Sequence, residues 1–221
     1  MPDMYSNKIR ERVEADVSGD VAKFLVEQKK RIVKQAIMNE PVDWAKENDE
    51  LYRILAPKLN KITMDVAISS MEGLPGGIDI ADVSRFSLDW VRRYFEELKK
   101  INDKTERVVR SAVADYFNTT GMTRGDLEEQ LVNSGLFSPV RASRIAVTET
   151  TRAYAQAEHI IGDEYRKLGI QMEDIWNTDN DDLVCEICAP LNDQPRGEAW
   201  QEDPPAHVNC RCTISHRVKR G

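Results

Sequence analysis

All four cysteines of the chain lie between residues 185 and 212, together with one of its three histidines. They form two short segments, CEIC at 185–188 and PPAHVNCRC at 204–212. A C-x2-C spacing lets two sulfur atoms converge on one metal ion, and zinc prefers four nitrogen or sulfur ligands in a tetrahedron. A segment with so few apolar residues builds little core of its own, so this pattern predicts that a metal orders the end of the chain.

The two segments supply five candidate ligands for four coordination positions: Cys185, Cys188, His207, Cys210 and Cys212. We expect Cys185, Cys188, His207 and one of the last two cysteines to bind one structural zinc ion per chain. The spacing does not choose between Cys210 and Cys212, because residues two apart on a strand point to the same face. The alternatives are buried thiols that pack as small apolar side chains, and disulfides.

A catalytic zinc site is a weaker prediction. A deaminase-type site needs a His-x-Glu motif before its P-C-x-x-C segment, with the glutamate as the proton carrier. Here His207 follows the C-x2-C pair, and residue 209 is asparagine. We therefore expect no catalytic residues and no enzymatic activity.

Composition restricts the other functions. A net charge of -7 and a pI of about 5.2 argue against a non-specific polyanion binder, which requires a surplus of Lys and Arg. The sequence contains no apolar run of about 18 residues and no apolar signal-peptide region near its N-terminus, so we expect no membrane interaction. A cytoplasmic chain keeps its thiols reduced, which favours a metal over disulfides.

The first two-thirds of the chain has the periodicity of amphipathic helices. We expect helices over residues 7–38 (with a possible break at Ser18–Gly19), 42–56, 57–71, 87–101 and 102–118, separated at 73–80 by a glycine-rich loop. Proline at position 57 suits the first turn of a helix, and Asn102 suits an N-cap. Thr123 and Asp126 fit a capping box.

The clearest helix is predicted over residues 139–168, with Ser138 as its N-cap, Pro139 in its first turn and Gly169 at its end. After it, the alternation in IQMEDIWNT predicts a short strand and DNDD at 179–182 predicts a turn. The expected fold is therefore α+β and mostly α-helical: a helical region over 1–119, then a domain over 120–221. In that domain a small zinc-stapled module at 170–216 would pack its short strands on the helix.

The predicted helix 139–168 carries polar side chains among small apolar ones. Arg144, Thr148, Thr151 and Arg152 lie within reach of one another at helical spacing, and Glu149 is adjacent. The favoured interpretation is that Arg144, Thr148 and Glu149 attach the cysteine module to this helix by hydrogen bonds and ion pairs. We expect His159 to be a partly buried or surface residue of this helix and His216 to be solvated in the tail.

Three motifs in this order, SRIAVTETTRAYAQA, IWNTDNDDLVCEICAPLNDQP and PPAHVNCRCTI, resemble the C-terminal domain of phage Mu protein F-like proteins. These are minor head, or head morphogenesis, proteins of tailed phages and prophages. The resemblance spans roughly residues 120–221, while residues 1–119 share only a helical character with such proteins. The family's Arg-Thr-Glu reads Val147-Thr148-Glu149 here, and Arg144 is the nearest substitute for the arginine.

The resemblance implies a low-copy structural protein that acts in procapsid assembly at or near the portal, and in some phages in DNA packaging or entry. It implies the portal, the major capsid protein or a scaffold as partners, and the host cytoplasm and then the virion as locations. One alternative is a nucleic-acid-binding zinc module with a basic tail (Arg211, Arg217, Lys219, Arg220). The other is a metal-dependent hydrolase or transferase that uses Glu149.

Overall fold

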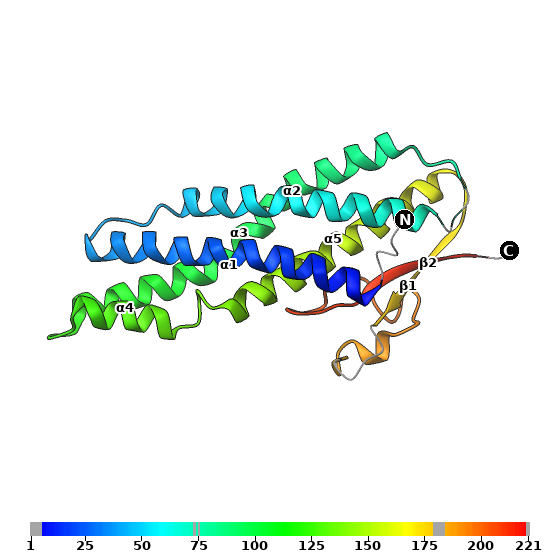
Figure 1. The fold of residues 1–221 in the computed structure, drawn as a ribbon. Helices are drawn as coiled ribbons and strands as arrows, with labels where there is room; N and C mark the ends of the chain where they lie inside the picture. The colour runs from blue at the N-terminus through cyan, green and yellow to red at the C-terminus, as the bar shows by residue number, and fades with distance from the viewer. Residues whose placement is uncertain (1–5, 73, 75, 179–183, 220–221) are drawn as a thin grey trace.

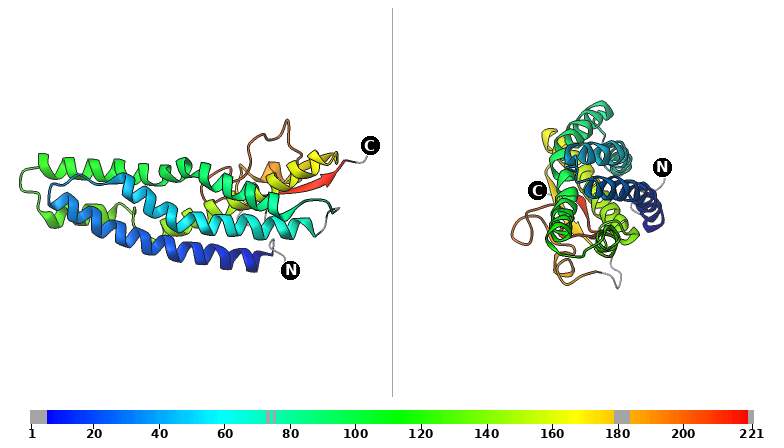
Figure 2. Two further views of the ribbon diagram at one scale, coloured as in Figure 1. Left: turned by 90° about the horizontal axis from the view of Figure 1, so that it is seen from above. Right: turned by 90° about the vertical axis from the view of Figure 1, so that its left-hand side faces the viewer.

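The computed structural model describes residues 6–72, 74, 76–178 and 184–219. Within these ranges the chain forms an elongated bundle of α-helices with a small two-stranded sheet at one end (Figures 1 and 2). The expected α+β, mainly helical fold is confirmed. The elements are α1 (Asn7–Ile37), α2 (Trp44–Met71), α3 (Ile80–Asn118), α4 (Arg124–Asn133), α5 (Pro139–Lys167), β1 (Met172–Asn177), a 3-10 turn η1 (Ala189–Leu191) and β2 (Thr213–Val218).

The bundle is built around one large apolar core to which α1, α2, α3 and α5 all contribute. Leu25, Leu55, Leu59 and Tyr154 are completely buried in it. A second apolar cluster forms where the C-terminal halves of α1 and α3 meet α4. The periodic apolar stripes of the sequence therefore do face a common interior, as amphipathic helices require. None of the described helices is long and apolar enough to cross a bilayer.

The two helices expected over 42–56 and 57–71 are one helix, α2, with Pro57 inside it. Proline lacks the amide hydrogen for one backbone bond and usually disfavours a helix interior by about 3 kcal/mol. Apolar side chains on both sides of Pro57, including Leu55 and Leu59, are fully buried against the core. Tertiary packing of this continuous stripe outweighs the local penalty. The helix α1 likewise runs through Ser18–Gly19 without a break.

The helices expected over 87–101 and 102–118 are also one element, α3, which begins earlier at an Asp79 N-cap. Asn102 does not cap a helix. It is buried, accepts a hydrogen bond from Gln28 Nε2 at 3.0 Å and donates one to Asn48 Oδ1 at 2.8 Å. Polar bonds to α1 and α2 satisfy its amide, so the backbone continues as helix.

The predicted ends of the later helices are confirmed. Thr123 and Asp126 form the capping box of α4. Ser138 Oγ accepts from the Arg141 amide at 3.2 Å at the start of α5. Gly169 follows this helix with a φ of 81°, a left-handed conformation that glycine adopts without strain.

The strands β1 and β2 pair in antiparallel fashion, from Met172 opposite Val218 to Asn177 opposite Thr213. The strand predicted after Gly169 is thus confirmed as β1, and the sheet lies against α5 (Figure 1). The turn predicted at 179–182 lies outside the described residues.

Candidate metal centre

The cysteine module, defined here as residues 170–216, has a small core of its own. Trp176 of β1 and Trp200 contact each other edge to face with ring centroids 5.3 Å apart, beside Ile214 of β2. Cys188, Cys210 and Cys212 are buried in the same cluster. The strands and the two tryptophans therefore bring the two cysteine segments together.

The side chains of both segments converge. Cys185 Sγ lies 3.0 Å and Cys188 Sγ 3.3 Å from Nε2 of His207, and the Sγ atoms of Cys188 and Cys210 are 3.8 Å apart. Two sulfurs at about 2.3 Å from a tetrahedral zinc would be separated by about 3.8 Å. The spacing of this sulfur pair thus fits a shared ion.

Two overlapping groups share Cys188: Cys185 with Cys188 and His207, and Cys188 with Cys210 and Cys212. Within each group the candidate ligand atoms lie within 4.8 Å of one another. All four cysteines are free thiols rather than disulfides. The cluster could therefore hold a metal ion, and each of the five predicted ligands belongs to it.

The surroundings shift the pKa values of these side chains in opposite directions. Burial raises the pKa of Cys188 to about 12, the hydrogen bond with Cys210 raises that of Cys212, and the bond with the Val208 carbonyl raises that of His207. Burial opposes ionisation of Cys185, but hydrogen bonds from Cys188 and Ile187 outweigh it and lower the pKa of this thiol. A hydrogen bond from the Cys212 thiol lowers the pKa of Cys210 to about 5. The His207 Nδ1 lies 2.9 Å from the carbonyl of Val208, which can only accept, so Nδ1 donates and Nε2 faces the thiols.

Two threonines of α5 hold the second cysteine segment. Thr148 Oγ1 accepts from the Asn209 amide at 2.9 Å, and Thr151 Oγ1 donates to the Cys210 carbonyl at 2.6 Å. Both contacts fix the backbone beside a candidate ligand. Thr148 therefore contacts the module, as its predicted attachment role requires, and Thr151 does the same.

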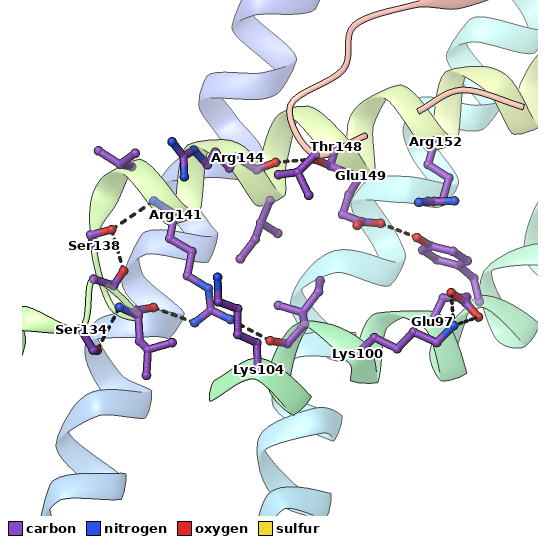
Figure 3. Close-up of a pocket in the computed structure, with 17 residues that line it drawn as sticks. Glu97, Lys100, Lys104, Ser134, Ser138, Arg141, Arg144, Thr148, Glu149 and Arg152 are labelled. Carbon is purple, nitrogen blue, oxygen red and sulfur yellow. Dashed lines mark hydrogen bonds and ion pairs between the residues drawn. The ribbon is translucent and has the colours of Figure 1, made fainter. Parts of the chain in front are cut away.

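Glu149 and Arg144 are placed differently from the prediction. Glu149 is buried and accepts a hydrogen bond from the Tyr94 hydroxyl of α3 at 2.7 Å, so its contact is with the bundle rather than the module (Figure 3). Burial raises the pKa of Glu149. Arg144 is exposed and lines a pocket between α3 and α5. Both side chains line this pocket rather than contacting the cysteine segments.

A second attachment, which no motif indicated, joins the module to α1. Arg211 forms an ion pair with Glu14 at 2.7 Å, and Arg10 donates to the Arg211 carbonyl at 2.5 Å and to Thr151 at 2.6 Å. Arg10 and Glu14 are almost completely buried. Arg211 therefore is not part of a free basic tail, as the nucleic-acid alternative assumed. Arg217 and Lys219 are exposed, and Arg220 lies outside the described residues.

His216 is not solvated, contrary to expectation. Its side chain is 2% exposed; Nδ1 lies 3.1 Å from Asp174 Oδ1, and Nε2 lies 3.1 Å from Glu158 Oε2. It approaches α5 at Gly162, where an added Cβ would lie only 2.7 Å from the imidazole. A buried charged group fastens β2 to α5 here. His159, by contrast, is 44% exposed, as predicted.

A family model described as Phage Mu protein F like protein matches residues 104–215, about half of the chain. The chain therefore belongs to this family, which confirms the resemblance found in its motifs. The match begins within α3 and includes α4, α5, β1, the candidate metal ligands and the first half of β2. The division of the chain at residues 119 and 120 stays a prediction. No curated protein and no solved structure matches the chain.

Proposed function

We propose that this protein is a phage or prophage minor head protein, a low-copy structural component that acts in procapsid assembly at or near the portal. The observation that carries the proposal is the family match over residues 104–215. The protein would meet its partners, the portal and the major capsid or scaffold protein, in the host cytoplasm and remain in the virion. A position at or near the portal would also favour a role in DNA packaging or entry.

The metal in this proposal is a structural zinc ion. Thiolates and imidazole are the ligands that zinc prefers, and structural sites fill all four positions with protein side chains. Here five candidate ligands surround the site, and Cys188, Cys210 and Cys212 are at most 4% exposed. Such a site leaves no open position for a catalytic water, which supports a non-enzymatic role.

The fourth ligand in this proposal is Cys210, and Cys212 is the spare thiol. Cys210 has the sulfur at 3.8 Å from Cys188, and Thr151 fixes its carbonyl. It also follows His207 at the spacing of Cys188 after Cys185, with its amide bonded to the His207 carbonyl at 3.2 Å. Both pairs are therefore presented by similar turns.

Co-assembly tests the assembly role. The chain is co-expressed with the portal protein of the same phage or prophage, and separately with its capsid and scaffold proteins, and the mass of each complex is measured by light scattering. We expect a stable complex with the portal and a weaker or absent one with the others. The Cys185→Ser variant, which should not bind the metal, is tested in parallel and shows whether complex formation requires an intact cysteine module. Failure to form a complex with any of these head proteins would contradict the proposal.

A further inference from the structure

A pocket of about 540 Å³ opens between α3 and α5, and none of the candidate metal ligands lines it (Figure 3). Its walls are α3, the loop between α4 and α5, and one face of α5, and Val208 of the cysteine module closes one side. This volume is within the range of small-molecule sites, roughly 300–1,000 Å³.

Cations line both walls. Arg141, Arg144 and Arg152 recur along one face of α5, and Lys104 of α3 faces them (Figure 3). Among the residues that the structure describes, no carboxylate lies within ion-pair distance of any of these four. The chain as a whole carries a charge of -7, so this concentration of unpaired positive charge runs against its surroundings.

The two carboxylates of the pocket do not cancel these charges. Glu97 is paired with Lys100 of its own helix at 2.7 Å. Glu149 is buried, takes the hydroxyl hydrogen of Tyr94 and is attracted by Arg152, so it sets at most one negative charge against the four cations. The pocket is therefore positive at neutral pH.

Arg141 is held in place by neutral acceptors, and Arg152 has the buried Glu149 as its nearby negative group. Arg141 donates to Thr105 Oγ1 and to the carbonyls of Leu136 and Ile101, all neutral acceptors, at 2.7–2.9 Å. The Nε of Arg152 is buried and has no hydrogen-bond partner among the described residues, and its guanidinium lies over the Tyr94 ring. A buried donor without an acceptor is unfavourable, and an anion in the pocket would satisfy it.

The rest of the lining is apolar: Ile101, Leu136, Val140, Ile145 and Val208. We propose that this pocket binds a small organic phosphate, with an apolar or aromatic body of about nucleotide size on the aliphatic wall and its phosphates on the arginines. Guanidinium groups match the oxygens of phosphate by paired hydrogen bonds, and several arginines together suit a group with more than one negative charge. The site does not depend on the proposed assembly role.

Calorimetric titration of the full-length, metal-loaded protein with ADP tests this site, with adenosine as the matched uncharged probe. Arg144→Glu and Lys104→Glu are the test variants, because both side chains are exposed and neither forms a hydrogen bond with the part of the chain that the structure describes. Arg107→Glu is the control, since it makes the same charge change on an exposed residue of α3 outside the pocket. Thermal melts verify that all three variants fold.

We expect ADP to bind, adenosine to bind much more weakly, and each test variant to weaken ADP binding by at least about tenfold. Arg107→Glu should leave the affinity within about twofold of wild type, because the exposed charge lies beyond the first contacts and salt screens it. Absence of ADP binding at millimolar concentration would overturn the proposal. Three other outcomes would also overturn it. They are equal losses of affinity in all three variants, equal affinity for adenosine and ADP, and binding of a short DNA duplex but not of ADP.

Discussion

The helical bundle and the cysteine module are ordered by different physical means. The bundle buries a large apolar cluster in which leucines, isoleucines and valines of four helices interlock. The module's cluster has seven buried residues, and three of them are cysteines. Apolar burial dominates in the first, with a few buried polar bonds between helices, whereas the second has few apolar residues and makes polar contacts with α1 and α5. The two regions should therefore respond to different perturbations.

Removal of the proposed metal should produce the largest difference in stability between the bundle and the cysteine module. Binding free energy in small zinc modules is folding free energy, on the order of 10 kcal/mol. We expect chelation to expose the backbone amides of β1, β2 and residues 184–212 to hydrogen exchange while those of α2 stay protected. Protection that is unchanged in the module would show that it is ordered without a metal.

The four cysteines should not be equivalent. We expect Cys185→Ser to destabilise the module far more than serine at the spare position, which we assign to Cys212. Zinc per chain and reactive thiols, measured before and after chelation, check this: one zinc and about one reactive thiol support the assignment. Equal effects of serine at all four positions would contradict a spare thiol.

The next largest effect should come from Glu14→Ala. This change leaves Arg10 without its buried carboxylate and removes the ion pair of Arg211, and breaking one partner of a buried pair costs about 3–5 kcal/mol. Denaturant unfolding measures the loss, with the exposed Glu11→Ala of the same helix as the control. A similar small effect in both variants would mean that α1 does not hold the module.

The buried histidine should make the attachment of β2 to α5 depend on pH. Burial lowers the pKa of His216, but the bonds with Asp174 and Glu158 outweigh this and raise it to about 9. Because the folded value lies above that of the unfolded chain, the stabilisation is complete below about pH 6.5 and is lost as the pH rises to about 9. We expect wild type to lose about 2–3 kcal/mol relative to His216→Gln across this window, measured by unfolding at each pH. A constant difference would contradict a charged His216.

Alanine at two glycines inside helices should have the smallest effects on stability, and the two effects should be opposite in sign. Nothing lies within 4 Å of a Cβ added at Gly19 of α1, so Gly19→Ala should stabilise the protein by about 0.5–1 kcal/mol. Gly162→Ala improves the same helix propensity but collides with His216, and should destabilise by about 1–3 kcal/mol. Melting temperatures of the two variants should therefore shift in opposite directions. Stabilisation by both would mean that β2 does not pack closely on α5.

Local chemistry was enough to predict the elements whose ends are fixed by their own residues. Ser138, Pro139 and Gly169 determine the bounds of α5, and the cysteine spacing predicted which side chains would converge. Pro57 and Asn102 misled the prediction of α2 and α3, because a shared core and cross-helix amide bonds override what these residues favour locally. Such partners cannot be seen in a single stretch of sequence.

The buried charged residues also could not be predicted from local sequence. Arg10 and Glu14 have the spacing of an ordinary surface pair on a helix, and no local pattern indicates that Arg211 will cover them. The burial of His216 did have a signal. Cys212, Ile214 and His216 alternate along RCTISHRV, which places the histidine on the inward face of β2 with two buried residues.

The contact between Arg211 and Glu14 also has a consequence for how the protein is made. The residues of α1 leave the ribosome before their partner, since Arg211 follows Glu14 by 197 positions. Until then Arg10 and Glu14 face water or a chaperone on the surface of an unfinished bundle. This contact can therefore close only after Arg211 has been synthesised, and a head-assembly partner that recognises the closed end would not bind a chain that still lacks it.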